Sequence, residues 1–514
     1  MTNKVEEKTM KKAKTLMIQG TASSVGKSII VAGLCRIFKQ DGYKVAPFKA
    51  QNMALNSYVT AGGGEIGRAQ VVQAEAAGIA PTVDMNPVLL KPTTDTGCQV
   101  IVLGKVARTI SARDYYQYTP ALLETVSQAL DRLRATYDIV VIEGAGSPAE
   151  INLKEQEIVN MRVAKMSDSP VLLVGDIDKG GVFASLVGTL ALLEDDERRY
   201  FKGLIINKFR GDVTLLKSAI DFLEKRTGLP MLGVVPFFRD IRIAQEDSVY
   251  LDERVGTPSA GDLDIAVIRL PHISNYDDFD PLEEDGCTVN YVRQRFELGS
   301  PHLIILPGTK STVADLAYLR RSGLAAAILA KAKAGTPVIG ICGGYQMLGQ
   351  KILDPHRVES NETEVAGLGL LEAVTAFVPE KSTSQVRAQV ISDLGLLAGA
   401  KGLEVAGYEI HMGQTRSQAK SSAFRITETP QGTADYTDGI LNDKGTVLGT
   451  YMHGLFHNHD FRRVFLNNLR KHWELPESER ETVNTKDRQY DKLADLVRRS
   501  LDIPQICRIM ERGV

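Results

Sequence analysis

The chain has 514 residues, of which 43% are hydrophobic and 24% are charged, and its formal net charge is −2. This length predicts two or three domains, and the composition is that of an ordinary globular protein. The near-neutral charge gives no electrostatic reason to expect a nucleic acid or a membrane surface as a partner. No apolar run approaches the ~18 residues that a membrane helix needs, which argues against a membrane span.

Residues 1–13 form a charged leader of mixed sign without an apolar core, so we expect a disordered tail and not a secretory signal. The five cysteines lie far apart, with no Cys-x-x-Cys pair and no clustered histidines beside them. This spacing argues against a disulfide framework and a structural zinc site, and it favours the reducing cytoplasm. We expect most of the thiols to be buried as small hydrophobic groups.

Apolar runs alternate with helical patterns through residues 14–250. We predict buried strands at residues 15–20, 44–49, 139–144, 170–176, 203–208 and 231–236. Helical periodicity lies between them, for example over residues 27–42 and 122–137. The runs lack polar alternation, as is typical of parallel strands that helices cover on both faces. Residues 14–250 therefore predict a doubly wound α/β domain with a parallel sheet.

The rhythm breaks at residues 251–261, where Gly, Pro and Ser predict a linker. Strand-like runs restart at residues 263–271, 301–308 and 336–344, which predicts a second α/β domain over residues 262–466. Residues 467–514 are rich in Arg, Asp and Glu, and they predict a C-terminal helical extension packed on the outside. The sequence thus predicts two α/β domains in tandem.

The stretch "KTLMIQGTASSVGKSIIV" (residues 14–31) indicates a phosphate-binding loop between a strand and a helix. Five residues separate Gly20 from Gly26, where the usual loop has four. A cradle needs inward-facing backbone N–H groups and a helix N-terminus, and both fit this spacing. We therefore predict ATP binding by Gly20, Thr21, Gly26, Lys27 and Ser28, with Lys27 neutralising the outer phosphates and Ser28 binding Mg²⁺. The alternative is an ordinary Gly-Lys-Ser helix entry.

Polar residues end three other predicted strands. Glu143 would emerge at the sheet edge where the loop opens, and its carboxylate is a candidate ligand of Mg²⁺. Asn207 is a candidate for recognition of the adenine ring through its amide, and Asp178 is a weak candidate for contact with a substrate. Strand-end polar residues are often only turn formers. Their convergence on one edge favours a site.

The five-residue spacing of "GTASSVGKS", together with "EGAG" (143–146) and "NK" (207–208), resembles the dethiobiotin synthetase branch of P-loop proteins. Enzymes of that branch use ATP to phosphorylate or otherwise activate a carboxylate, and the resemblance implies the same for this domain. A MinD- or ParA-like ATPase switch is an alternative with a related fold. Such switches carry a further lysine in a K-G-G-x-G-K pattern, whereas this chain has "TASSVGK".

The stretch "TPVIGICGGYQMLG" (residues 336–349) predicts a strand, a sharp turn and a helix, with Cys342 at the turn. Small neighbours are required at such a nucleophile elbow, and Gly343 follows the cysteine directly. The helix N-terminus would stabilise the thiolate. We predict that the N–H of Gly343 and a donor from the loop around Gly308 bind an oxyanion.

A cysteine nucleophile needs a base, and "GTVLGTYMHGLFHNHD" (445–460) offers three histidines. We predict that His453 is the base, because a strand end fixes it, and that His457 and His459 face the solvent. The alternative for a lone Cys or His is a structural role.

Residues 262–465 resemble the class I glutamine amidotransferase domain of the cobyric/cobyrinic acid synthase type, including "GYEIHMG" (407–413). Within that stretch Glu409 and His411 are weak candidates for contact with glutamine. One position departs from the class: Leu455 stands where ordinary members carry a glutamate two residues after the histidine. The orienting third member of the triad is therefore missing or comes from elsewhere.

The similarity to this family runs through nearly all of residues 15–470, and residues 46–105 resemble the branch that makes cobyric acid. The resemblance implies ATP- and glutamine-dependent amidation of carboxylates b, d, e and g of adenosylcobyrinic acid a,c-diamide. The two sites should communicate inside the protein, because water must be excluded. A rival hypothesis is the same machinery acting on another tetrapyrrole or on a cell-wall carboxylate.

Six side chains are weak candidates for contact with the corrinoid or phosphate. Three belong to a predicted helix over residues 67–78, for which a solvated polar face is an equal alternative. The six are Lys49, Arg68, Gln70, Gln73, Lys91 and Asp178. The expected partners are the corrinoid, glutamine and ATP, without nucleic acid or membrane. The sequence predicts no oligomeric state.

Overall fold

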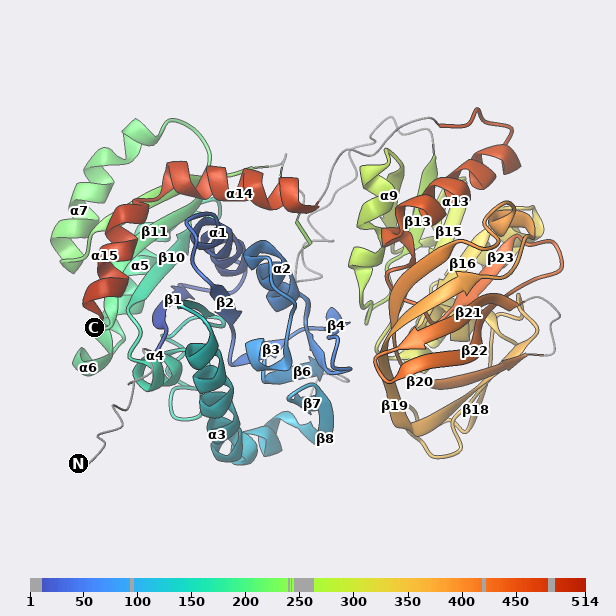
Figure 1. Ribbon diagram of the computed structural model, residues 1–514, viewed down its shortest axis with the longest axis horizontal. Coiled ribbons are helices and arrows are strands. Elements are labelled where there is room, and N and C mark those ends of the chain that lie inside the picture. Colours follow the sequence, from blue (N-terminus) through green and yellow to red (C-terminus); the bar gives the residue numbers. More distant parts are fainter. Residues whose placement is uncertain are drawn as a thin grey trace, which may run out of the picture.

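The computed structural model describes residues 12–92, 97–238, 241, 243–244, 263–417, 422–478 and 486–514, without the side chains of 112–114 and 116–118. Most of the predicted leader and the whole predicted linker lie outside these residues. Two lobes lie side by side (Figure 1). All five cysteines are free thiols, and four of them are buried, as predicted. Among the described helices, none is long and apolar enough to cross a membrane.

The first lobe contains a six-stranded sheet in which every described strand pair is parallel. Its order is β12 (Met231–Pro236), β11 (Phe201–Phe209), β10 (Val171–Asp176), β1 (Lys14–Gly20), β9 (Ile139–Glu143) and β2 (Val45–Phe48). All six strands were predicted, because apolar runs without polar alternation are buried on both faces. The predicted doubly wound α/β fold is confirmed.

Helices cover both faces of this sheet (Figure 1). One face packs against α1 (Lys27–Gln40) and α2 (Arg68–Ala77), with the C-terminal α14 (Lys486–Ser500) and α15 (Ile503–Arg512). The other face packs against α3 (Ala112–Thr136), α4 (Met161–Ser167), α5 (Val182–Ala191) and α7 (Lys217–Thr227). The short helix α6 (Asp195–Arg198) follows α5. The two hydrophobic layers leave the carboxyl ends of the strands open for a site.

The C-terminal segment corrects the predicted domain boundary. The boundary at residue 466 falls inside α13 (His459–His472), and Leu469, which lies beyond that boundary, belongs with Phe465 to the core of the second lobe. The chain then returns to the first lobe, where Arg36 of α1 binds Asp487 (2.9 Å) and Asp491 (2.7 Å) of α14. Residues 467–514 are therefore not one extension. Composition identified helices but could not show which domain buries their apolar faces.

The second lobe is built on an eleven-stranded mixed sheet. Its parallel part contains β14 (Thr288–Val292), β13 (Asp264–Ile268), β15 (Leu303–Leu306), β16 (Val338–Ile341) and β23 (Val447–Thr450). The remaining strands are β22 (Gly432–Leu441), β21 (Ser422–Thr429), β20 (Glu404–Ser417), β19 (Ala373–Val390), β17 (Lys351–Leu353) and β18 (Glu364–Ala366). Its other helices are α9 (Asp280–Glu284), α10 (Thr312–Arg321), α11 (Leu324–Lys333) and α12 (Gly343–Leu348).

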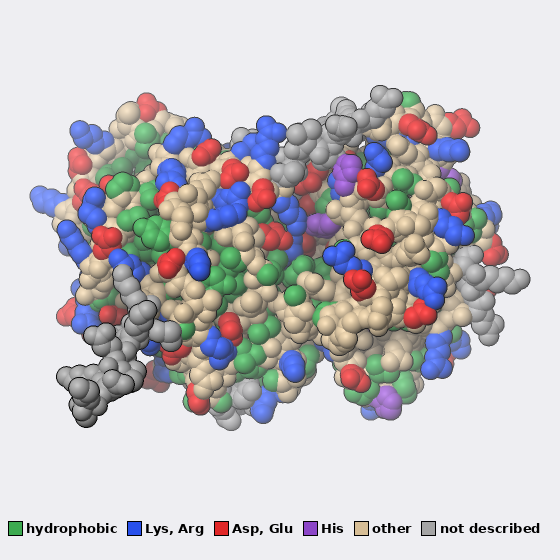
Figure 2. All heavy atoms as spheres, viewed as in Figure 1, with side chains coloured by type: hydrophobic (Ala, Val, Ile, Leu, Met, Phe, Trp, Pro, Cys, Tyr) green, Lys and Arg blue, Asp and Glu red, His purple; other side chains and the backbone are tan. Residues whose placement is uncertain are grey.

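Two small sheets of the first lobe were not predicted. They are β3 (Gln51–Met53), β6 (Val88–Pro92), β7 (Gly97–Val102) and β8 (Lys105–Ser111), and the hairpin of β4 (Ser57–Val59) with β5 (Glu65–Gly67). The hairpin contacts β19 and β20 of the second lobe through hydrogen bonds such as Gln385 Nε2 to Tyr58 Oη (3.0 Å). Charges of both signs are interspersed over the face shown in Figure 2, in keeping with the net charge of −2.

Candidate active sites

The loop between β1 and α1 forms a phosphate cradle. Gly26 has a φ of 96°, and a Cβ there would collide with the amide nitrogen of Asn207, so only glycine fits. Ser24 takes a φ of 57° within the longer loop. Lys27 Nζ donates to the carbonyl oxygen of Gly146 (3.1 Å) and to a carbonyl of the loop itself (2.9 Å). The ammonium therefore lies across the mouth of the cradle, where phosphate oxygens would replace these carbonyls.

Other predicted nucleotide contacts frame the loop. Gly20 is the last residue of β1, and the N–H of Thr21 donates to the carbonyl of Val174 (2.9 Å). Asn207 ends β11 beside the loop and donates Nδ2 to the carbonyl of Val25 (2.8 Å). This bond braces the loop, so contact between Asn207 and adenine stays a prediction.

Glu143 is the centre of a buried polar cluster next to the loop. Its carboxylate accepts from Ser28 Oγ (2.8 Å), Lys49 Nζ (3.0 Å) and Gln73 Nε2 (2.5 Å). Burial by itself would raise the pKa of Glu143, but the Lys49 charge and the hydrogen bonds of Gln73 and Ser28 lower it. An anionic carboxylate beside a hydroxyl at the phosphate loop is a donor set that suits Mg²⁺.

The second site is a nucleophile elbow between β16 and α12. Cys342 has φ 51° and ψ −108°, a strained conformation that is uncommon outside glycine and characteristic of such turns. Gly344 lies so close to the carbonyl of Leu306 that a Cβ would clash with it. The cysteine therefore sits at the N-terminus of α12, with its sulfur 3.5 Å from the carbonyl oxygen of Ile410.

His453, the predicted base, lies three residues after the end of β23 and is fully buried. Its Nδ1 lies 2.7 Å from Oδ2 of Asp278, and the other carboxylate oxygen accepts from the N–H of Gly454 (2.8 Å). Burial lowers the pKa of His453, but the charge and hydrogen bond of Asp278, with the sulfur of Cys342, raise it to about 10. The imidazolium form is thus favoured beside the sulfur.

Asp278 fills the role for which the sequence offered no residue. Leu455, at the usual glutamate position, is buried in the hydrophobic core. Asp278 lies in the 3-10 turn η3 (Tyr276–Phe279), 175 residues before His453. The sequence signal was the acidic stretch "YDDFD" shortly after a predicted strand, which was not read as part of the site.

The two predicted oxyanion donors lie around the thiol. Gly308 is next to His453, because a Cβ on it would meet the imidazole Cε1 at 2.8 Å. A Cβ on Gly343 would meet the backbone nitrogen of Thr309 at 3.2 Å. Backbone N–H groups of both loops are thus close together beside Cys342. The oxyanion assignment remains a prediction that this arrangement supports.

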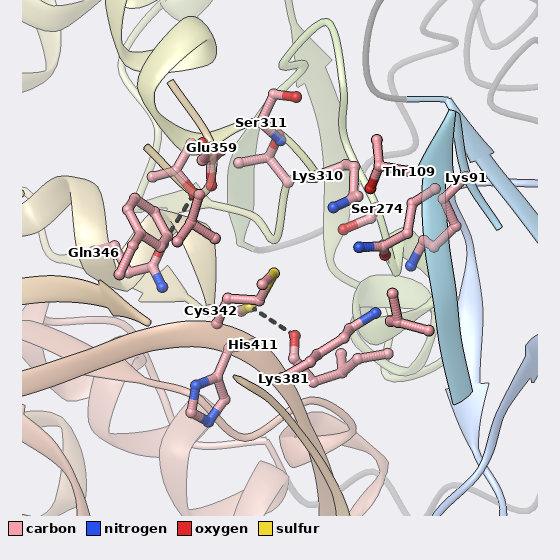
Figure 3. Close-up of a pocket in the computed structure, with 18 of the residues that line it drawn as sticks. Lys91, Thr109, Ser274, Lys310, Ser311, Cys342, Gln346, Glu359, Lys381 and His411 are labelled. Carbon is pink, nitrogen blue, oxygen red and sulfur yellow. Dashed lines mark hydrogen bonds between the residues drawn. The ribbon is translucent and has the colours of Figure 1, made fainter. Parts of the chain in front are cut away.

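A cavity of about 520 Å³ opens from Cys342 and is lined by both domains. Figure 3 shows Lys91, Lys310 and Lys381 on one side of it, and Gln346 and Glu359 on the other. Lys91 and Lys381 share the buried carboxylate of Glu65, at 2.7 and 2.5 Å. Strands β6, β7 and β8 of the first lobe therefore form part of the wall of the cavity at Cys342.

A basic and an acidic group in this cavity, Lys310 and Glu359, have shifted pKa values. Burial, with repulsion from Lys381 and Lys91, lowers the pKa of Lys310 to about 8. Burial raises the pKa of Glu359 to about 7, and its carboxylate accepts from the N–H of Val313 (2.8 Å). A cation and a carboxyl group in one cavity suit a zwitterionic ligand such as an amino acid.

Of the two weak candidates for contact with glutamine, one lines the cavity and the other does not. His411 lines the cavity, and burial lowers its pKa to about 4, so the ring is neutral. Glu409 is buried and accepts from the hydroxyl of Tyr436 (2.9 Å), away from the residues that line the cavity. His457 does not face the solvent as predicted, because its Nε2 lies 3.1 Å from the carbonyl of Asp277. His459 is exposed, as predicted.

The weak candidates for the corrinoid are mostly internal. Arg68, Gln70 and Gln73 are buried, so neither a solvated helix face nor an open substrate surface describes them. Gln70 accepts from Asn52 (3.0 Å), and Arg68 forms an ion pair across the domain boundary. The helical periodicity of the sequence could not distinguish a polar face exposed to solvent from one whose side chains are buried and paired inside the protein. Asp178, by contrast, is partly exposed and binds Arg210 (2.7 Å).

Asp278→Asn is expected to lower kcat for glutamine hydrolysis by about 10²-fold or more, as loss of the orienting carboxylate does in other triads. The amide no longer stabilises the imidazolium, so the pKa of His453 should fall from about 10 toward its ordinary value. Steady-state hydrolysis and the pH dependence of Cys342 alkylation measure both effects. Asp285→Asn, at an acid that binds Arg462 in the same lobe, is the control. A wild-type rate in Asp278→Asn would contradict the assignment.

Comparisons with known proteins agree with both halves. A family described as the CobQ/CobB/MinD/ParA nucleotide binding domain matches residues 16–249, and the CobB/CobQ-like glutamine amidotransferase domain matches residues 264–461. A solved glutamine amidotransferase structure aligns with 40% of this chain and 98% of its own at 19% identity. Its TM-score of 0.32 is too low to carry an argument.

Curated relatives match nearly the whole chain. A cobyric acid synthase from Dehalococcoides mccartyi (strain CBDB1) is 62% identical over 98% of this chain and 100% of its own length. One from Sorangium cellulosum (strain So ce56) is 52% identical over 97% of this chain and 99% of its own. Identity of this extent covers both domains and the segment that returns to the first one. The chain therefore belongs to the cobyric acid synthase family.

Proposed function

We propose that the protein uses ATP and glutamine to amidate carboxylates b, d, e and g of adenosylcobyrinic acid a,c-diamide, which gives adenosylcobyric acid. The observation that carries this proposal is that one chain contains both a phosphate loop and a Cys342–His453–Asp278 triad. The cavity at Cys342 is lined partly by residues of the domain that carries the phosphate loop. Full-length similarity to cobyric acid synthases supports the substrate. The MinD/ParA-like switch is not favoured, because a switch has no use for the triad.

In the amidotransferase site, Cys342 Sγ attacks the amide carbon of glutamine, and the N–H groups near Gly343 and Gly308 stabilise the oxyanion. His453 transfers its proton to the leaving nitrogen, which departs as ammonia and leaves a thioester. Water then hydrolyses the thioester to glutamate. Asp278 holds the imidazole in one orientation throughout.

In the synthetase site, the loop from Gly20 to Ser28 binds the phosphates of ATP, and Lys27 neutralises their charge. Ser28 and Glu143 would hold Mg²⁺, which supplies charge neutralisation between the phosphates. Lys49 lies at the same carboxylate and is positioned to contact a phosphate or the substrate carboxylate. Transfer of the γ-phosphoryl group of ATP to the substrate carboxylate releases ADP, and ammonia then displaces phosphate from the acyl phosphate to give the amide.

Ammonia must travel from Cys342 to this second site without meeting bulk water. The cavity at Cys342 is lined on the synthetase side by Lys91, Gln99 and Thr109, which supports an internal route. Lysine ammonium groups along the wall disfavour a second cation and so favour neutral ammonia over ammonium. We place the reaction in the cytoplasm, in keeping with five free thiols.

The experiment that tests the proposal follows the corrinoid product by mass spectrometry. The full-length protein is incubated with adenosylcobyrinic acid a,c-diamide, MgATP and glutamine that carries heavy nitrogen in its amide. Four successive mass steps with the heavy label are expected. No mass change, with glutamine hydrolysis intact, would contradict the corrinoid as substrate and keep the amidotransferase.

Lys310→Met is expected to raise KM for glutamine about tenfold, a loss of ~1.4 kcal/mol, because the ammonium would pair with the α-carboxylate. The lowered pKa of Lys310, about 8, predicts the pH dependence. Above that pH the wild-type lysine is neutral, so the ratio of wild-type to variant kcat/KM should fall as pH rises through about 8. Lys331→Met is the control, because Lys331 of α11 donates to Ser300 and does not line the cavity. A ratio that does not change with pH would contradict this contact.

A further inference from the structure

The loop that carries Asp278 is bound on its outer side by the nucleotide-binding domain. Asn275 Nδ2 donates to the carbonyl oxygen of Ser57 in β4 (2.7 Å). The N–H of Tyr276 donates to Oδ1 of Asn56 (3.2 Å). All these groups are buried, so they are shielded from competing water. The segment just before the triad carboxylate is therefore held by residues of the other domain.

Arg68 adds a charge to this contact. It is the first residue of α2, and its Nε lies 3.1 Å from Oδ2 of Asp277, the residue before Asp278. Both side chains are only 4% exposed. A buried carboxylate is costly without a partner, so removal of Arg68 would leave the Asp277 charge uncompensated. The ion pair therefore adds to the hydrogen bonds with Asn56 and Ser57 in holding the turn η3 in place.

Aromatic packing connects the same arginine to the imidazole. The Arg68 guanidinium lies over the ring of Tyr58, 5.5 Å from its centroid. Tyr58 meets Tyr408 edge-on at 5.1 Å, and Tyr408 stacks on His453 at 5.3 Å with 17° between the rings. Arg68 is thus connected to His453 through the rings of Tyr58 and Tyr408, and to the turn that carries Asp278 through its ion pair with Asp277.

We propose that Arg68 is a positioning residue of the glutaminase triad, supplied by the synthetase domain. Its ion pair with Asp277 holds η3 so that Asp278 points at Nδ1 of His453, and the triad is complete only when the two domains are docked. This inference rests on the proposed roles of Cys342 and His453. Gln73 of the same helix donates Nε2 to the carboxylate of Glu143, so α2 contacts both active sites.

The test compares the full-length wild type with Arg68→Met and Arg68→Lys in two assays. Glutamine hydrolysis without ATP or corrinoid reports the triad, and amidation with free ammonia reports the synthetase site. Arg68→Met should lower kcat for hydrolysis by about 10- to 100-fold, with KM for glutamine changed by less than about threefold. Its loss in hydrolysis should exceed its loss in ammonia-dependent amidation by about tenfold or more. Arg68→Lys should recover part of kcat, because it keeps the charge but not the planar fork.

A second variant separates positioning from folding. Arg68→Met with Asp277→Leu removes both buried charges, so it should melt close to the wild type while its hydrolysis stays low. Arg132→Met, which breaks an exposed pair with Asp84 in the same domain, should change neither assay. The proposal is overturned if hydrolysis by Arg68→Met stays within about twofold of wild type, or if both assays fall by one factor. Because hydrolysis needs no corrinoid, an incorrect corrinoid assignment would leave this comparison intact.

Discussion

Cys342→Ala is expected to abolish glutamine-dependent amidation and to leave amidation with free ammonia. Hydrolysis of glutamine should fall by about 10³-fold or more, because no thioester can form without the sulfur. Release of glutamate and the mass of the corrinoid product, measured with each nitrogen source, check both parts. The expected contrast follows from the two sites being built on separate sheets of one chain.

Cys287→Ala is the matched control for this variant. Cys287 is also a buried thiol of the second lobe, but it lies outside the cavity that contains Cys342. It should lose stability at most and keep both activities. Glutamine-dependent amidation that survives in Cys342→Ala would refute the elbow cysteine as the nucleophile. Loss of the ammonia-dependent reaction in the same variant would instead show that the thiol also serves the synthetase site.

Lys27→Met is expected to lower amidation by about 10³-fold with glutamine and with ammonia alike, since the phosphate charge is then unbalanced. Hydrolysis of glutamine in the absence of ATP should persist, because Lys27 Nζ donates to carbonyls of the phosphate loop and of Gly146, and Lys27 does not line the cavity that contains Cys342. Release of phosphate and formation of the amidated product are the two measurements. The pattern is the reverse of that for Cys342→Ala.

Lys39→Met tests whether the loss is specific. Lys39 lies in the last turn of the same helix α1 and is exposed, so its removal should change neither activity. An amidation rate in Lys27→Met within about twofold of wild type would rule out its proposed role at the phosphates. Equal activity of the two variants would favour the ordinary helix entry that the sequence left open.

The sequence predicted the central sheet of the first domain because each strand carries its own signal. The strands β1, β9, β10 and β11 each carry a continuous apolar run, since helices cover both faces of the sheet. The three-residue strands β3, β4 and β5 carry no such pattern, and their pairing depends on contacts with segments far along the chain. The contact that β4 makes with β19 and β20 of the second lobe was not predicted for this reason.

Local motifs identified the reacting groups but not their partners. Cys342 was recognised from the glycines beside it, and Lys27 and Ser28 from the loop between a strand and a helix. The burial of Arg68 against Asp277 was not predicted, because it is set by domain docking and not by the neighbours of Arg68 in sequence. The sequence predicted C-terminal helices packed on the outside, but not that α14 packs on α1 of the first lobe, where Arg36 pairs with Asp491.

Short runs of neighbouring residues were enough to predict two α/β domains in order, a phosphate loop in one and a cysteine elbow in the other. The tertiary structure was needed to place Asp278 beside His453, 175 residues away in sequence, and to show that both domains line the thiol cavity. Those features depend on which buried surfaces pack against each other. A local sequence pattern does not predict this packing, because polar groups become buried and paired through contacts between segments that are far apart in sequence.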